Sequence, residues 1–97
     1  MGRFDQAKLM LKANKLQKEL QKTIITAEKG NGAVCVEISG EQKIKKIRID
    51  PDFVDLEDIG QLEKWLEEAI REAIQESQKV AAETMQPIMG ELGNLGL

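Results

Sequence analysis

The sequence has no histidine, no tyrosine, a single cysteine and only three aromatic residues among its 97 positions. Without histidine, Cys35 alone cannot supply a Cys/His metal site, nor can it form an internal disulfide. Cys35 stands between two valines with no general base at a recognisable spacing, which argues against nucleophilic catalysis. We therefore predict that the chain is not an enzyme and uses no metal, cofactor or small-molecule substrate.

Long apolar runs are also missing. Segments such as AVCV at 33–36 are far shorter than the roughly 20 residues that span a bilayer, and no cationic start leads into a hydrophobic signal segment. We expect a cytoplasmic protein without a membrane partner. Its length and its 41% hydrophobic content allow one domain, residues 1–97, with one modest core, which association with a second copy would help to stabilise.

Residues 4–23 lack Gly and Pro and are rich in Lys, Gln, Leu and Ala, which predicts a long first helix. At about 100° per residue, its apolar stripe falls within about 80° of arc and comprises Leu9, Ala13, Leu16, Leu20 and Ile24. Its lysines fall within a separate arc of about 120°, almost opposite, and are Lys8, Lys12, Lys15, Lys18 and Lys22. The apolar stripe could pack on its own fold or on a partner helix.

Residues 24–50 predict a three-stranded antiparallel sheet. The β-branched TIIT at 23–26 begins the first strand, GNG at 30–32 makes a hairpin turn, and residues 33–39 alternate as a half-buried strand. The third strand is KIKKIRI at 43–49, where Ile44 is out of phase with the later isoleucines. We predict a β-bulge or bend near Lys45 and Lys46.

The dipeptide Asp50-Pro51 ends the third strand, and Asp55 or Asp58 is suited to cap a second helix over 58–86. Pro87 marks the approximate end of that helix, and residues 88–97 are expected to form a flexible tail. The resulting order α-β-β-β-α predicts an α+β fold, with helices on one side of the sheet or projecting from its ends.

Charge is unevenly distributed along this acidic chain, whose net charge is −3. Residues 1–49 hold 11 basic and 5 acidic side chains, whereas residues 50–97 hold 3 basic and 12 acidic ones. The lysine arc has an ordinary interpretation as a solvated helix face, but only Glu19 interrupts it, and Lys46 and Arg48 add basic charge on the outward side of the third strand.

The central residues resemble those of the YbaB/EbfC family of bacterial nucleoid-associated proteins. The similarity covers nearly the whole chain and is carried by Val34-x-Val36-x-Ile38-x-Gly40, Ile44-x-x-Ile47-x-Ile49-Asp50-Pro51, Val54, Leu62-Glu63 and Leu66-x-x-Ala69-Ile70-x-x-Ala73. The resemblance implies a tweezer-like homodimer that binds DNA with little or modest sequence preference and is located at the nucleoid. The scarcity of aromatic residues disfavours base stacking with single strands and so favours double-stranded DNA.

The same resemblance implicates the helical arms in DNA contact. By position it points to Lys8, Lys12, Lys15, Lys18 and Lys22, to which the outward residues Lys46 and Arg48 are added from the charge pattern. Our first hypothesis is thus a dimeric DNA-binding protein. The second is a protein-interaction scaffold in which the amphipathic first helix binds a partner.

Overall fold

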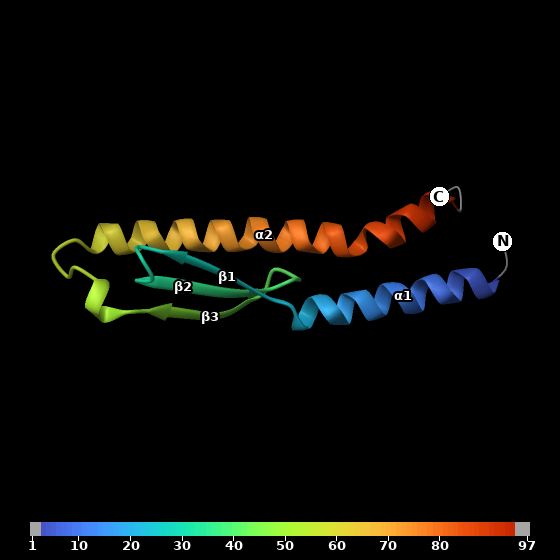
Figure 1. Cartoon of the computed structure of the whole chain (residues 1–97), viewed down its shortest axis with the longest axis horizontal. Helices are drawn as coiled ribbons and strands as arrows, with labels where there is room; N and C mark the ends of the chain where they lie inside the picture. Colours follow the sequence, from blue (N-terminus) through green and yellow to red (C-terminus); the bar gives the residue numbers. More distant parts are fainter. Residues whose placement is uncertain (1–2, 95–97) are drawn as a thin grey trace.

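The computed structural model describes residues 3–94 and has the predicted α-β-β-β-α order. The elements are α1 (Arg3–Lys22), β1 (Ile24–Lys29), β2 (Val34–Ser39), β3 (Ile44–Ile49), a short 3-10 helix (Pro51–Phe53) and α2 (Ile59–Asn94). The molecule is a rod of 65 × 20 × 15 Å, with the sheet toward one end and α1 continuing from it toward the other (Figure 1). The predicted α+β class is confirmed.

The sheet is antiparallel with strand order β1-β2-β3. Gly30, Asn31 and Gly32 all have positive φ angles (66°, 56° and 94°), as the tight turn between β1 and β2 requires. Between β2 and β3, the pairing shifts from Glu37 opposite Lys46 to Ile38 opposite Ile44, which leaves Lys45 as an extra residue. The predicted bulge is confirmed.

The core lies between one face of the sheet and α2. Its buried residues come from one position of β1, from alternate positions of β2 and from one stripe of α2, and they are Ala27, Val34, Val36, Ile38, Ala69 and Ala73. The alanines let the helix backbone approach the sheet closely, and larger side chains pack around this centre, including Trp65. The backbone of α2 runs along β1 and β2, and β3 lies farther from it.

α1 joins the sheet through a close backbone contact. The Gly40 N–H donates to the carbonyls of Leu20 (2.9 Å) and Thr23 (3.0 Å), so the end of α1 is capped by the turn after β2. A Cβ at position 40 would lie 2.9 Å from the Leu20 carbonyl oxygen, closer than side chains approach. Nearby, the buried Ser77 hydroxyl of α2 donates to the Ser39 carbonyl (2.6 Å). These contacts fix where α1 leaves the sheet.

The expected end of the second helix is wrong. α2 continues through Pro87 to Asn94, so residues 88–94 are helical and do not form the flexible tail expected there; residues 95–97 lie outside the described part. Proline removes one backbone hydrogen bond and bends a helix without having to end it, and the ribbon bends in this region (Figure 1). Ile88, directly after the proline, is buried where α2 passes α1, and this packing outweighs the local preference.

The start of α2 agrees with the sequence, since an Asp58 carboxylate oxygen accepts from the Gln61 N–H at 3.2 Å. Of the two acids considered as caps, Asp58 has this role. Asp55 instead accepts from the Glu57 N–H (2.9 Å) within the loop before the helix.

Candidate nucleic-acid interface

α1 packs along the C-terminal part of α2, and we call these two segments, residues 3–22 and 78–94, the arm. The sheet and residues 59–77 form the body. Leu9 and Leu20 are buried and Leu16 is half-buried, so the apolar stripe of α1 faces α2. Ile24, assigned to the same stripe from the sequence, lies in β1 and is 51% exposed, because the helix has already ended at Lys22.

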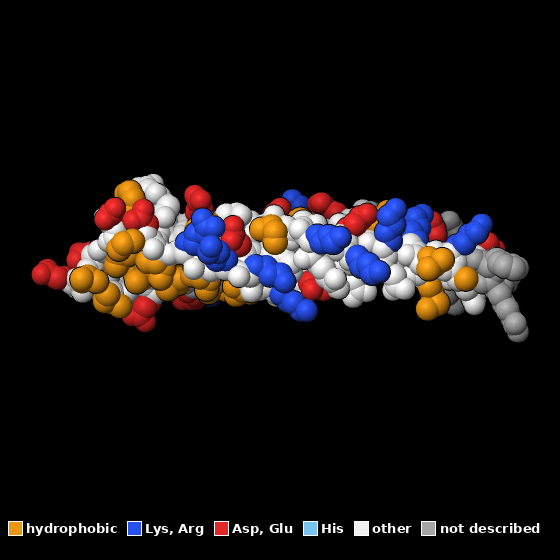
Figure 2. Space-filling model, turned by 90° about the horizontal axis from the view of Figure 1, so that it is seen from below, with side chains coloured by type: hydrophobic (Ala, Val, Ile, Leu, Met, Phe, Trp, Pro, Cys, Tyr) orange, Lys and Arg blue, Asp and Glu red, His pale blue; other side chains and the backbone are white. Residues whose placement is uncertain are grey.

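Because the apolar stripe faces α2, the lysines of α1 face water. We call Lys8, Lys12, Lys15, Lys18 and Lys22 the lysine row. All five are exposed. At 1.5 Å per residue, the row is about 21 Å long, which matches about six phosphates along one strand of B-DNA at 3.4 Å each. Figure 2 shows basic side chains following the arm and continuing onto the body on the face seen there.

One member of the row has a carboxylate partner. The Lys12 Nζ lies 2.7 Å from the Glu91 Oε1 of α2, and the two side chains are 50% and 45% exposed. Among residues 3–94, no salt bridge within 4.0 Å is found for the other four lysines. The lysine row therefore combines one neutralised position with four whose ammonium groups are open to solvent.

Lys46 and Arg48 lie on the body, on the sheet face away from α2. In the β2–β3 register Lys46 is opposite Glu37 and Arg48 is opposite Cys35. Both cations are exposed, but a carboxylate lies directly across the strand pair from Lys46. These two residues thus lie on the body and not on the arm, on a surface of mixed charge.

The acidic half of the chain lies on the exposed side of α2 and in the loop before it. Near β1, the Lys29 Nζ is 2.8 Å from the Glu72 Oε2. The hydrogen bond and the charge of Glu72 raise the pKa of Lys29 above its ordinary value. Lys29 is thus part of an ion pair on the body, whereas the lysine row lies on the arm.

Cys35 is a poor candidate nucleophile. Burial, followed by the charges of Glu28 and Glu37, raises the pKa of its thiol, and Arg48 opposes this only in part.

Within residues 3–94 no three His, Cys, Asp or Glu residues are arranged to hold a metal ion. No helix in the same part of the chain has the length and hydropathy of a membrane span.

Comparison with known proteins identifies the family of this chain. The profile of the YbaB/EbfC DNA-binding family matches residues 1–92. The chain belongs to this family. A nucleoid-associated protein of Chloroflexus aurantiacus is 35% identical over 95% of this chain and 99% of its own length. A nucleoid-associated protein of Corynebacterium jeikeium is 33% identical over 99% of both chains.

A solved structure supports the fold of this YbaB/EbfC chain. The crystal structure of an uncharacterized protein from Helicobacter pylori superimposes with a TM-score of 0.76, covering 86% of this chain and 87% of the other. At 19% identity, this similarity bears on the fold alone. The resemblance inferred from the sequence is confirmed at the level of family and fold.

Sequence reasoning missed two features. Glu91 falls in the segment expected to form a flexible tail, where it is the one charged side chain in the sequence 88–97. The exposure of β3 was also not predicted: Ile44, Ile47 and Ile49 are each 44–45% exposed. The bulge places all three isoleucines on the same face of the sheet as the buried residues of β2, but no local pattern shows that α2 leaves them exposed.

Proposed function

We propose that the protein binds double-stranded DNA as a homodimer, with the lysine row of each copy contacting phosphates and with Lys46 and Arg48 extending the site onto the body. The observation that carries this proposal is the lysine row: five exposed lysines on one helix face, four of them without an ion pair among the described residues. Membership of the YbaB/EbfC DNA-binding family supports it.

Little sequence preference is expected of such a surface. Lysines that contact the backbone respond to charge, whereas base identity is read by hydrogen bonds to base edges in the grooves. The chain is also poor in stacking groups for single strands, since Trp65 packs on the core and only Phe4 and Phe53 remain. Contact through lysines and the scarcity of stacking groups both favour binding to the regular phosphate array of a duplex.

Association into a homodimer would place two lysine rows, ten lysines in all, on one DNA molecule. The named relatives are nucleoid-associated proteins, which supports a role for this chain at the nucleoid. The alternative of a scaffold that binds a partner through the apolar stripe of α1 is less well supported, because that stripe already packs against α2.

The lysine row can be tested by fluorescence anisotropy with a labelled duplex at 50–200 mM salt. If about six lysines of the dimer contact phosphate, log K should fall with log salt at a slope near −5. Lys15→Glu removes one contact per copy, so the slope should become shallower by about 2 and the affinity should fall about tenfold or more.

Lys64→Glu is the matched control, because Lys64 is an exposed lysine on the body and its reversal changes the net charge equally. It should reduce affinity far less than Lys15→Glu. If the two reversals weaken binding equally, net charge alone governs the interaction, and the proposal for the lysine row is wrong. Unlabelled single strands should displace the labelled duplex less effectively than unlabelled duplex does at the same concentration.

A further inference from the structure

Leu11 is an apolar residue on the outermost side of the arm. At about 100° per residue, it lies about 170° around α1 from the midpoint of the buried Leu9 and Leu20, so it points away from α2. Its side chain is 69% exposed. Figure 2 shows hydrophobic side chains among the basic ones toward the outer part of the arm. A partner that meets the lysine row therefore also meets Leu11.

The neighbours of Leu11 on this side of α1 are cations and an amide. Lys8 and Lys15 lie one helical turn before and after it, and Lys18 lies two turns after it. Among the residues that the structure describes, no salt bridge within 4.0 Å is found for these three lysines. Asn14, which is also exposed, lies on the turn after Leu11. Unpaired positive charge and one hydrogen-bonding side chain thus surround an apolar group.

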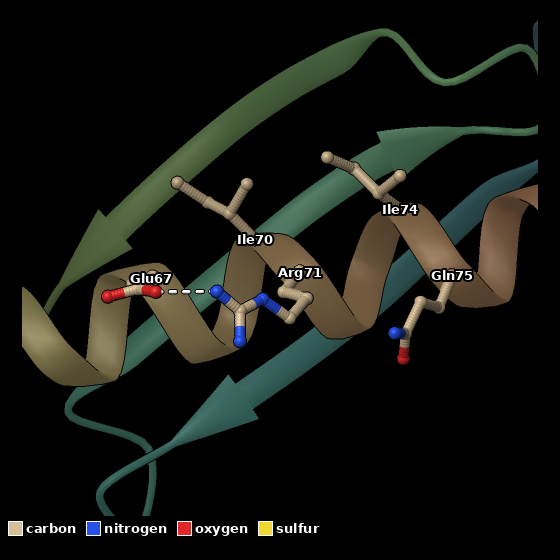
Figure 3. Close-up of a pocket in the computed structure, with 5 residues that line it drawn as sticks. All are labelled: Glu67, Ile70, Arg71, Ile74 and Gln75. Carbon is tan, nitrogen blue, oxygen red and sulfur yellow. Dashed lines mark hydrogen bonds and ion pairs between the residues drawn. The ribbon is translucent and has the colours of Figure 1, made fainter.

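The apolar surface of the body has a different charge environment. Ile70 and Ile74 line an open hollow of about 390 Å³ on α2, with Glu67, Arg71 and Gln75 around it (Figure 3). The lining holds one acid and one cation, and the Arg71 guanidinium lies 2.6 Å from the Glu67 carboxylate. This hollow therefore offers no net charge to a polyanion. Leu11 differs because the lysines around it favour an anionic partner.

The minor groove of a DNA duplex has the two properties that the surroundings of Leu11 require. Phosphates line both edges of the groove, and an apolar side chain can enter between base pairs from the groove floor. The groove is about 6 Å wide and does not admit a helix, but a single leucine at the outermost side of α1 can reach into it while the lysines stay at the phosphates. Asparagine is one of the side chains that hydrogen-bond to the floor of this groove.

We propose that Leu11 enters the minor groove as an apolar wedge between two base pairs and bends the duplex, with Asn14 hydrogen-bonding to the groove floor beside it. This inference rests on the DNA binding in the proposed function, and it adds the groove and the residue that enters it. Pyrimidine–purine steps such as TA unstack easily, whereas A-tracts are stiff. The protein should therefore have a modest preference for duplexes that contain TA steps.

The wedge can be tested on the full chain with a duplex that carries 2-aminopurine at a TA step. Leu11→Ala keeps a good helix former and every cation, so the salt slope should match the parent, while the affinity should fall about fivefold to tenfold. The parent should raise the fluorescence of 2-aminopurine by unstacking it, and Leu11→Ala should not. Met10→Ala is the matched control, because Met10 is 67% exposed but lies about 100° around the helix from Leu11. It should behave as the parent does.

Competition between duplexes gives a second test. For the parent, an unlabelled duplex with TA steps should compete better than an A-tract duplex of the same length, and Leu11→Ala should lose this difference. If Leu11→Ala matches the parent in affinity, fluorescence and preference, the wedge is overturned while the lysine row stands.

Two other partners of Leu11 are distinguished in parallel. If Leu11→Ala lowers the mass measured by analytical ultracentrifugation, or weakens binding to phosphatidylglycerol vesicles and not to duplex, then Leu11 contacts protein or lipid and the inference is wrong. A parent chain that binds no duplex would overturn the proposed function together with the wedge. Loss of the wedge alone would leave the salt slope of the parent near −5.

Discussion

Replacing Glu91 by glutamine should strengthen DNA binding. The Glu91 Oε1 lies 2.7 Å from the Lys12 Nζ, so the carboxylate pairs with the charge that a phosphate would bind. A phosphate that approaches Lys12 must compete with Glu91 for the same charge. Glutamine keeps the size of the side chain and removes the competitor. The change therefore isolates the effect of one carboxylate on the lysine row.

The expected magnitude follows from the exposure of the pair. With side chains 50% and 45% exposed, the ion pair is worth about 0–1 kcal/mol. Its release should therefore raise affinity by up to about fivefold per arm, or about 25-fold for a dimer that uses both arms. If both Lys12 side chains gain a phosphate contact, the salt slope should steepen by about 2.

Anisotropy titrations between 50 and 200 mM salt measure both quantities. Glu57→Gln removes the same charge from an exposed position in the loop before α2 and serves as the control. The stability of Glu91→Gln should fall by no more than about 1 kcal/mol, which thermal denaturation can follow. If Glu91→Gln and Glu57→Gln change the affinity equally, Glu91 does not compete with phosphate and the reasoning is refuted.

Gly40→Ala should destabilise the protein by about 1–3 kcal/mol and lower DNA affinity, because its Cβ would press on the end of α1; an unchanged melting temperature would contradict this. Gly30→Ala should cost a similar amount and alter Trp65 fluorescence, since its Cβ would lie 2.8 Å from the indole ring at a φ of +66°, whereas Gly32→Ala meets open space and should cost less. Alkylation of Cys35 should be slow at pH 7 and accelerate only above the ordinary thiol pKa of 9.0, and fast alkylation at pH 7 would show that the thiol is not protected. Because the pKa of Cys35 is raised in the folded chain, the contribution of this thiol to the free energy of unfolding should decline as the pH rises past 9.0.

Short-range sequence patterns were sufficient to predict the sheet. The turn residues Gly30 to Gly32, the alternation of β2 and the phase slip at Lys45 are all short-range signals, and the structure has each feature where the sequence predicts it. The apolar and basic faces of α1 could also be predicted, because the period of a helix decides which side chains share a face. These features need no knowledge of what the element packs against.

Features that depend on contacts between residues far apart in the sequence could not be predicted from local patterns. Pro87 is a strong local stop signal, but the burial of Ile88 beside α1 keeps the helix going. The pairing of Lys12 with Glu91 joins residues 79 positions apart, so no spacing rule could find it. The exposure of β3 depends on how many strands one helix can cover, which is a property of the packed layers.

The arm is built from the two ends of the described chain, since α1 begins and α2 finishes at the same pole of the rod (Figure 1). An affinity tag or fluorescent protein fused to either terminus would consequently emerge beside the lysines whose contacts are to be measured. A reporter inserted in the loop between Phe53 and Ile59, at the opposite pole, would leave that surface unobstructed.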